Sequence, residues 1–288
     1  MNKTVLDRYG NDRGHWVGDG FPVRSLFSYN DLGGHVSPFL LLDYAGPHVF
    51  EPTTKRLGVG QHPHRGFETV TIVYDGQVEH RDSAGHGGVI GPGDVQWMTA
   101  GGGILHEEYH APSFARTGGP FRMVQLWVNL PAKDKMAAPG YQPIVSSTIP
   151  VVELPEGAGS ARVIAGAFGG VVGPAHTFTP INVWDVRLKR DTDFSLDLPE
   201  GHTSMLVVLN GRITVDGTQD AGDAEMLLLS REGSAVHGHT HGDTTLLVLT
   251  GEPIDEPIVG YGPFVMNTQA EIRQAMADVR SGTFGRGP

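Results

Sequence analysis

Two histidines separated by one residue, His62 and His64, lie in the stretch QHPHRGFETV. If this stretch is extended, alternate side chains share one face of a strand and lie about 6.6 Å apart along it. Two imidazoles at that spacing can reach one metal ion with bonds of about 2.1 Å. Pro63 favours an extended conformation for His62, because proline disfavours the helical region for the residue before it. The pair is therefore a candidate half of a metal site.

A second group of candidate ligands follows in the stretch GGGILHEEYH. On a strand His106 and Glu108 would share a face, whereas Glu107 would point to the other side. Three imidazoles and one carboxylate form a donor set suited to Fe, Mn, Ni, Co or Zn. On an octahedral metal these four ligands leave two positions open for chemistry, whereas on tetrahedral zinc they would close the site.

Other residues remain alternatives as ligands. Glu68 and His110 have the right parity, but each lies four residues beyond its neighbouring histidine, about 13 Å along a straight strand. Either could ligate only if the strand bulges or turns first. The stretch HGHTH (237–241) has three histidines of one parity but no partner pair from an earlier strand, and we expect it in an exposed turn.

We expect polar or capping roles for the remaining histidines, which are His15, His35, His48, His80, His86, His176 and His202. Three tryptophans in apolar runs are expected in the core, with Trp97 also considered at the border of a pocket; these are Trp97, Trp127 and Trp184.

Composition excludes several classes of protein. The 288 residues carry 21 basic and 32 acidic side chains, a net charge of −11, which makes direct binding to nucleic acid a poor expectation. With no cysteine, the chain has no disulfide, no cysteine-zinc site and no thiol catalysis. No apolar run approaches the roughly 18 residues that span a membrane. The N-terminus lacks the apolar segment of a signal peptide, so we expect a cytoplasmic protein.

Strand-like runs separated by tight turns predict an all-β fold. Asp75-Gly76 and Asn210-Gly211 each stand between two such runs, as hairpin turns do. The order of run, Asx-Gly turn, run, Gly-Asp turn and run occurs in both halves, which predicts one β unit used twice.

A segment rich in Pro, Ala and Ser, residues 130–150, is expected to link the two halves. The predicted domains are residues 1–135 and 150–288. A capping box formed by Thr268 and Glu271 predicts a short helix over residues 267–282, within the second domain.

The stretches HPHRGFETV, PGDVQWMTAGGGILHEE and FRMVQLWVNLP strongly resemble the pirin family, a bicupin group of the cupin superfamily. The resemblance implies two cupin domains in tandem, each a jelly-roll β-sandwich, with one metal in the N-terminal domain. It implies that the metal ligands are His62, His64, His106 and Glu108. It thus favours Glu108 over Glu68, and it implies a C-terminal domain without metal.

The same resemblance implies a quercetin 2,3-dioxygenase-like activity, in which a flavonol is opened with O₂. The cofactor would be one divalent transition metal, Fe(II) first, with Ni, Mn, Co, Zn or Cu as alternatives. Glu108 would also be catalytic, accepting the proton of the flavonol 3-hydroxyl group. Two alternatives remain open. One is an iron-dependent, redox-sensing module that binds a protein partner as a transcriptional co-regulator, and the other is a purely structural metal.

Overall fold

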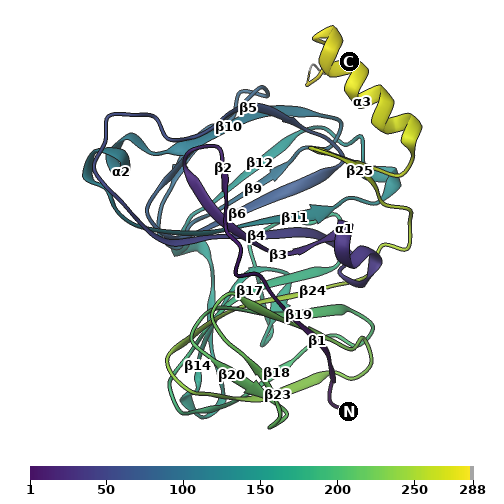
Figure 1. Cartoon of the computed structure of the whole chain (residues 1–288). Coiled ribbons are helices and arrows are strands. Elements are labelled where there is room, and N and C mark those ends of the chain that lie inside the picture. The colour runs from purple at the N-terminus through teal and green to yellow at the C-terminus, as the bar shows by residue number, and fades with distance from the viewer. Residues whose placement is uncertain (286–288) are drawn as a thin grey trace. The chain divides into compact units, whose positions relative to one another are not determined.

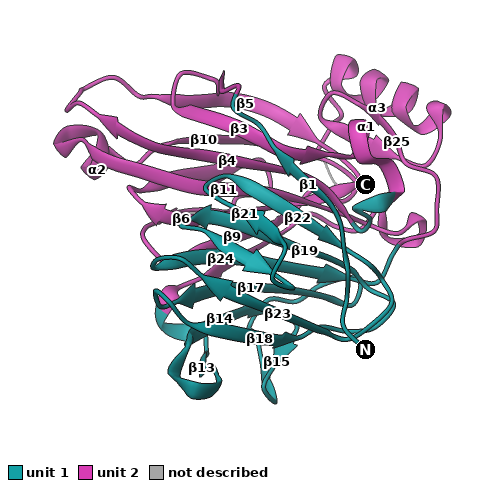
Figure 2. Cartoon of the chain, turned by 60° about the horizontal axis from the view of Figure 1, so that its bottom comes forward, with its two compact units in different colours: residues 1–12, 35–38, 147–253 teal, residues 13–34, 39–146, 254–288 magenta. Residues whose placement is uncertain are grey.

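The computed structural model describes residues 1–285, most of which lie in strands. The chain forms two compact units. Unit 1 consists of residues 1–12, 35–38 and 147–253, and unit 2 consists of residues 13–34, 39–146 and 254 onward (Figure 2). Each unit contains a seven-stranded and a four-stranded sheet with antiparallel neighbours, so the prediction of an all-β fold with two β-sandwiches is confirmed.

Unit 2 contains the candidate ligands. Its seven-stranded sheet has the order β12-β9-β6-β11-β4-β3-β2. These strands are β2 (His15–Val17), β3 (Phe21–Ser28), β4 (Phe39–Phe50), β6 (Phe67–Asp75), β9 (Val95–Thr99), β11 (Gly119–Asn129) and β12 (Gly140–Ile144). Its four-stranded sheet has the order β5-β10-β7-β8 and consists of β5 (Gly58–His64), β7 (Val78–Asp82), β8 (Gly87–Ile90) and β10 (Ile104–His110). Strands β5 and β10 are labelled in Figure 1. The smaller elements are α1 (Tyr29–Leu32), α2 (Pro112–Thr117), β25 (Val259–Tyr261), β26 (Phe264–Met266) and α3 (Gln269–Ser281).

Unit 1 has the same two-sheet plan. Its seven-stranded sheet, in the order β1-β22-β19-β24-β17-β14-β13, consists of β1 (Val5–Gly10), β13 (Val151–Glu153), β14 (Gly159–Ala165), β17 (Ile181–Leu188), β19 (Thr203–Asn210), β22 (Glu225–Leu229) and β24 (Thr244–Gly251). Its four-stranded sheet, in the order β18-β23-β20-β21, consists of β18 (Asp193–Asp197), β20 (Ile213–Val215), β21 (Gln219–Ala221) and β23 (Ala235–Thr240). A small hairpin joins β15 (Ala167–Phe168) to β16 (Val171–Val172).

The strand orders match between the units. In the larger sheets β9-β6-β11-β4 corresponds to β22-β19-β24-β17, and in the smaller sheets β5-β10-β7-β8 corresponds to β18-β23-β20-β21. The two predicted Asx-Gly turns occupy equivalent places, after β6 and after β19. Gly76 and Gly211 have φ values of 84° and 95°, which glycine adopts without strain. One β unit is therefore used twice, as the repeated turn pattern predicted.

Burial of apolar side chains between the sheets fixes strand placement in unit 2. Residues 67–74 of β6 are buried throughout, which explains the nearly continuous apolar and threonine run of that strand. Phe121 and Met123 of β11 pack with Phe21 and Val73 in one core cluster. This packing holds the larger sheet against the strands that carry the histidines.

The units differ from the predicted domains at both ends of the chain. Strand β1 pairs with β22, so the first residues belong to unit 1 rather than to the domain predicted as 1–135. The final strands and α3 belong to unit 2 rather than to the domain predicted as 150–288. The expected linker 130–150 is also wrong in part, because β12 adds a strand to the sheet of unit 2 by pairing with β9. These assignments depend on pairing between distant segments, which local sequence does not reveal.

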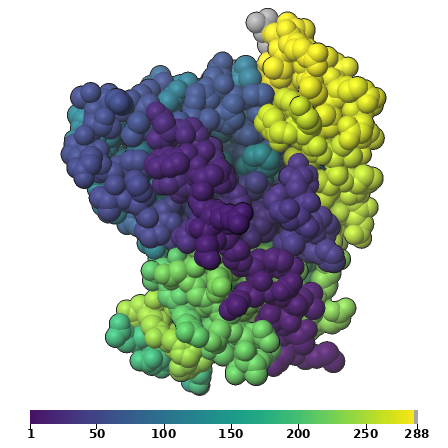
Figure 3. All heavy atoms as spheres, viewed as in Figure 1, coloured from purple at the N-terminus to yellow at the C-terminus, as the bar shows by residue number. Residues whose placement is uncertain are grey.

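The predicted helix is confirmed as α3. Thr268 is its N-cap and accepts a hydrogen bond from the Glu271 amide, and Gly282 ends it in the left-handed conformation. Ile272 is buried in a cluster that includes Phe264 and Met266. The helix lies at the surface of unit 2, where its residues are coloured yellow (Figure 3). Within residues 1–285, no helix combines the length and apolar character needed to cross a membrane.

Candidate metal centre

Three of the four predicted ligands converge at one point in unit 2. Strands β5 and β10 are antiparallel neighbours, and their register places His62 opposite His106. The ring centroids of His62 and His64 lie 4.8 Å apart, and those of His62 and His106 lie 4.2 Å apart. One ring nitrogen from each of the three histidines lies within 4.8 Å of the other two. Two neighbouring strands thus deliver three imidazoles to one place.

The chemistry of these histidines fits a metal ion. Nδ1 of His64 and Nε2 of His106 are buried and have no hydrogen-bond partner within the described residues. A buried polar atom without a partner costs free energy unless something binds it. His62 has its Nδ1 2.9 Å from the carbonyl oxygen of Gly60, so its Nε2 is the nitrogen available to a ligand. The arrangement therefore offers three nitrogen donors from a largely buried group.

Burial keeps two of these imidazoles neutral. Desolvation, followed by the charge of His62, lowers the pKa of His64 to about 3. Desolvation also lowers the pKa of His106 well below its usual value, with His64 and His62 as further causes. Neutral imidazole is the form that binds a metal ion. The site is thus prepared to receive a cation without first releasing protons from these two rings.

Glu108 shares the buried face of β10 with His106, as its parity suggested. The pairing of β10 with β7 is regular here, whereas β5 has one extra residue between His62 and Val59, so Glu108 lies opposite Val59. Its Oε1 accepts hydrogen bonds from Thr71 Oγ1 at 3.3 Å and Gln96 Nε2 at 3.2 Å, and its Oε2 accepts one from Gln125 Nε2 at 3.2 Å. In this structure Glu108 groups with His106 and His80, and it lines the same cavity as His62 and His64.

The alternative ligands Glu68 and His110 lie apart from this centre. Glu68 is on β6, in the other sheet, where its Oε1 accepts a hydrogen bond from Thr99 Oγ1 at 2.7 Å. Burial raises the pKa of Glu68 to about 7. His110 Nε2 lies 2.8 Å from the carbonyl oxygen of Gly20, and neither residue belongs to a potential metal group among the described residues. The chain turns into the second sheet after His64, which separates Glu68 from the histidines.

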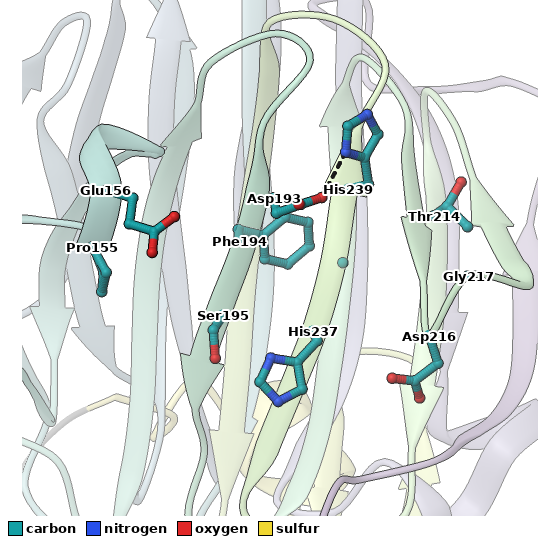
Figure 4. Close-up of a pocket in the computed structure, with 11 residues that line it drawn as sticks. Pro155, Glu156, Asp193, Phe194, Ser195, Thr214, Asp216, Gly217, His237 and His239 are labelled. Carbon is teal, nitrogen blue, oxygen red and sulfur yellow. Dashed lines mark hydrogen bonds and ion pairs between the residues drawn. The ribbon is translucent and has the colours of Figure 1, made fainter.

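The histidines of the stretch 237–241 form no such group within residues 1–285. Residues 237–240 lie on β23, the counterpart of β10, so the expected turn was wrong, although His237 and His241 are exposed as expected. His239 Nδ1 lies 2.8 Å from Asp193 Oδ1, and this pair borders an open hollow of about 490 Å³ with His237 and Asp216 (Figure 4). The counterpart of β5 in unit 1 is β18, which contains no histidine. Unit 1 therefore lacks the first ligand pair.

A cavity of about 380 Å³ in unit 2 is lined by His62 and His64. Its walls are mostly apolar and consist of Val17, Phe21, Val23, Val59, Met123 and Trp127, with Pro263 at one side. Its polar residues besides the histidines are Asp43, Glu108 and Gln125. This volume lies in the range of sites for small organic ligands. The cavity can accept an apolar, planar molecule that carries a few polar groups.

Trp127 was expected in the core, but it lines this cavity. Its ring stacks on Phe67 with a centroid distance of 4.3 Å and meets the His64 ring edge-on at 5.4 Å. Met123, Gln125 and Trp127 alternate along β11, so their shared face was a signal already present in the sequence. Trp97 is fully buried and is absent from the residues that line the cavity.

Comparison with known proteins gives matches over nearly the whole chain. The family model described as Pirin matches residues 20–128, and the model described as Pirin C-terminal cupin domain matches residues 183–285. A Pseudomonas aeruginosa protein named "Putative quercetin 2,3-dioxygenase" is 60% identical over 99% of both chains. A crystal structure of quercetin 2,3-dioxygenase from Acinetobacter baumannii is 55% identical over 99% of both chains, with a TM-score of 0.97. A bacterial pirin from Escherichia coli in complex with nickel(II) is 21% identical, covers 86% of this chain and 99% of its own, and has a TM-score of 0.65.

Proposed function

The chain belongs to the pirin family, and on that premise we propose that it is a metal-dependent dioxygenase that opens flavonols with O₂. The observation that carries the proposal is the convergence of three histidines, two of which line an apolar cavity of small-molecule size. The names of its relatives from P. aeruginosa and A. baumannii support the same class of substrate.

His62, His64 and His106 would hold the metal, Fe(II) first, and Glu108 would complete the set from the cavity wall. Three imidazoles and a carboxylate suit a borderline divalent cation. When bound, such a cation supplies Lewis acidity and a template for the adjacent oxygen atoms of a flavonol. The buried position of His64 and His106 keeps bulk water from the inner side of the site.

The apolar walls would bind the aromatic rings of the substrate. Met123 and Trp127 provide a face of β11 against which a planar molecule can pack, and Val59 lies on the strand that carries two of the histidines. Burying an aromatic surface contributes about 25 cal/mol per Å². Gln125 and Asp43 are polar residues of the same cavity and can orient hydroxyl groups.

Glu108 would accept the proton of the substrate 3-hydroxyl group. It is a carboxylate of the cavity wall, and Thr71, Gln96 and Gln125 hold it in place with three hydrogen bonds. Removal of the proton leaves an electron-rich enolate, which is the form that reacts with O₂. Fixing the base in one orientation is a condition for efficient proton transfer.

The test is to mix metal-reconstituted protein with quercetin in air and to follow the flavonol absorbance and the dissolved oxygen. We expect loss of the flavonol band with about one O₂ consumed per flavonol, the stoichiometry of a dioxygenase, and neither change without metal. If the band persists and no oxygen is consumed with any flavonol, the dioxygenase assignment is wrong. The redox-sensing, protein-binding function would then be the better one.

A further inference from the structure

We propose that His80 is a positioning residue for this centre: oriented by Asp82, it holds the proton of His106 on Nδ1 and leaves Nε2 of His106 for the metal. His80 lies on β7, the other neighbour of β10, and its side chain is fully buried. This inference rests on the proposed metal site but not on the identity of the substrate. It assigns a role to a histidine that sequence patterns did not distinguish from ordinary ones.

The buried carboxylate of Asp82 determines the state of His80. Asp82 Oδ1 accepts hydrogen bonds from the backbone amides of Ala84 at 2.9 Å and His86 at 3.0 Å. Asp82 Oδ2 lies 3.1 Å from His80 Nε2. An ionised carboxylate only accepts hydrogen bonds, so His80 must donate from Nε2. A neutral His80 ring then has an unprotonated Nδ1 that acts as an acceptor.

The next contact fixes His106. The Nδ1 atoms of His80 and His106 lie 3.4 Å apart, and both are buried. An unprotonated His106 Nδ1 would bring two lone pairs face to face, so His106 carries its proton on Nδ1 and shares the acceptor His80 Nδ1 with Gln96. The other nitrogen of His106, Nε2, then has a lone pair and no partner within residues 1–285. That nitrogen belongs to the His106 ring that groups with His62 and His64, which is where a metal would bind.

Gln96 ties the same network to Glu108. Tyr141 Oη donates to Gln96 Oε1 at 3.2 Å, which sets the orientation of the amide. The amide nitrogen of Gln96 then donates to His80 Nδ1 and to Glu108 Oε1, each at 3.2 Å. The Tyr141 ring also stacks on His80 with a centroid distance of 5.0 Å and an interplanar angle of 16°. One amide therefore links the orientation of His80 to that of Glu108.

Two overlapping groups of potential ligands share His106, and they differ in which of their atoms already have hydrogen-bond partners. One consists of His62, His64 and His106, and the other of His80, His106 and Glu108. In the second group both nitrogens of His80, Nδ1 of His106 and both oxygens of Glu108 already have partners. In the first group two buried nitrogens have none among the described residues. The first group therefore provides the three nitrogen donors for the metal, and His80 of the second group orients one of them, the usual role of residues that surround metal ligands.

The experiment measures Co(II) affinity by competition with a chelator, together with the visible absorption of the Co(II) form. His80→Leu removes the acceptor, and we expect the Kd to rise about 10- to 100-fold with a changed spectrum. His80→Asn places a side-chain oxygen close to the position of Nδ1, and we expect it to restore most of the affinity. Thermal melting of the metal-free variants checks that each is folded.

A second variant, Asp82→Asn, tests whether Asp82 acts through His80. The Asn oxygen can still accept from the amides of Ala84 and His86, but its NH₂ group would face His80 Nε2 and reverse the direction of the hydrogen bond. We expect a 10-fold or larger rise in Kd in the wild-type background. In the His80→Asn background we expect no further rise, because Asp82 acts through His80. Arg81→Gln, between them on the strand and largely exposed, is the control that should match wild type.

Three outcomes would overturn the inference. The first is wild-type affinity and spectrum in His80→Leu. The second is Co(II) binding that survives a His62→Ala/His64→Ala double variant but is lost in His80→Leu, which would make the His80 group the metal site. The third is no Co(II) binding by the wild type, which would remove the proposed metal site as well. The Co(II) measurements contain no flavonol. A protein that shows the expected Co(II) affinities but does not turn over flavonols would therefore refute only the dioxygenase proposal.

Discussion

The guanidinium group of Arg65, the residue after His64, donates to Asp278 of α3, with 2.7 Å between Nη1 and Oδ2. Its Nε donates to the carbonyl oxygen of Gly102 at 2.7 Å, and the Phe284 ring lies 4.6 Å from its Cζ. Arg65 is buried, so this ion pair is better shielded from solvent than an ordinary surface pair. The C-terminal helix thus holds the segment that delivers two of the three converging histidines.

Asp278→Asn should lower the free energy of unfolding by about 2 kcal/mol, the scale of a hydrogen bond to a charged group. The reason is that Arg65 would remain buried without an anion beside it. The measurement is urea unfolding of the wild type and the variant. Arg273→Gln, at an exposed position of the same helix, should change the unfolding free energy little. An Asp278→Asn variant as stable as wild type would show that the helix does not restrain this segment.

Local sequence was sufficient for the features that local geometry determines. The turns at Gly76 and Gly211 require positive φ values, and the cap at Thr268 requires a side-chain acceptor, so the residue types themselves indicate the structure. The spacing of His62 and His64 predicted two rings on one face because alternation is a property of any strand.

Features that depend on pairing between distant strands were not predictable in this way. The hydrogen bonds of Glu108 depend on the packing of β10 against the larger sheet, which supplies Thr71, Gln96 and Gln125. The contact of His80 with His106 depends on the pairing of β7 with β10. The assignment of β1 to unit 1 depends on its pairing with β22, at the other end of the sequence. Each required the complete sheet order rather than a local pattern.

Replacing His62 or His106 with Ala should remove most of the bound metal. Each change deletes one nitrogen donor from a group of three, and metal bound to the folded state adds stability by mass action. We therefore expect lower metal content by elemental analysis and a lower melting temperature in the presence of metal than for wild type. Full metal content in the His62→Ala/His106→Ala double variant would place the site elsewhere.

Glu108→Gln should reduce flavonol turnover by about 100-fold or more at matched metal content, the scale for loss of a general base. The amide is less basic, and its NH₂ group would face one of the donors that now hold the carboxylate, Gln96 or Gln125. Glu107→Gln is the matched control, since Glu107 pairs with Arg56 near the surface. The assay is oxygen uptake with a flavonol. Equal turnover by the Glu108 variant and wild type would exclude Glu108 as the base.

The pH dependence of stability should contain a contribution from Glu68, which is buried on β6. Burial raises its pKa from 4.5 to about 7, so the folded protein retains a proton that the unfolded chain releases between these values. The resulting stability is fully present below about pH 4.5 and is lost as the pH rises through 7. Because one pKa unit corresponds to about 1.4 kcal/mol, the expected loss is about 3 kcal/mol.

Glu68→Gln isolates this effect, because the amide does not titrate and its oxygen can still accept from Thr99. Relative to wild type, the free energy of unfolding of the variant should rise by about 3 kcal/mol between pH 4.5 and pH 8. Urea unfolding at the two pH values, with a chelator present so that metal release adds nothing, gives the comparison. Glu153→Gln on β13 is the control, because the Glu153 side chain is exposed rather than buried. If the difference between the Glu68 variant and wild type is the same at both pH values, burial does not raise the pKa of Glu68.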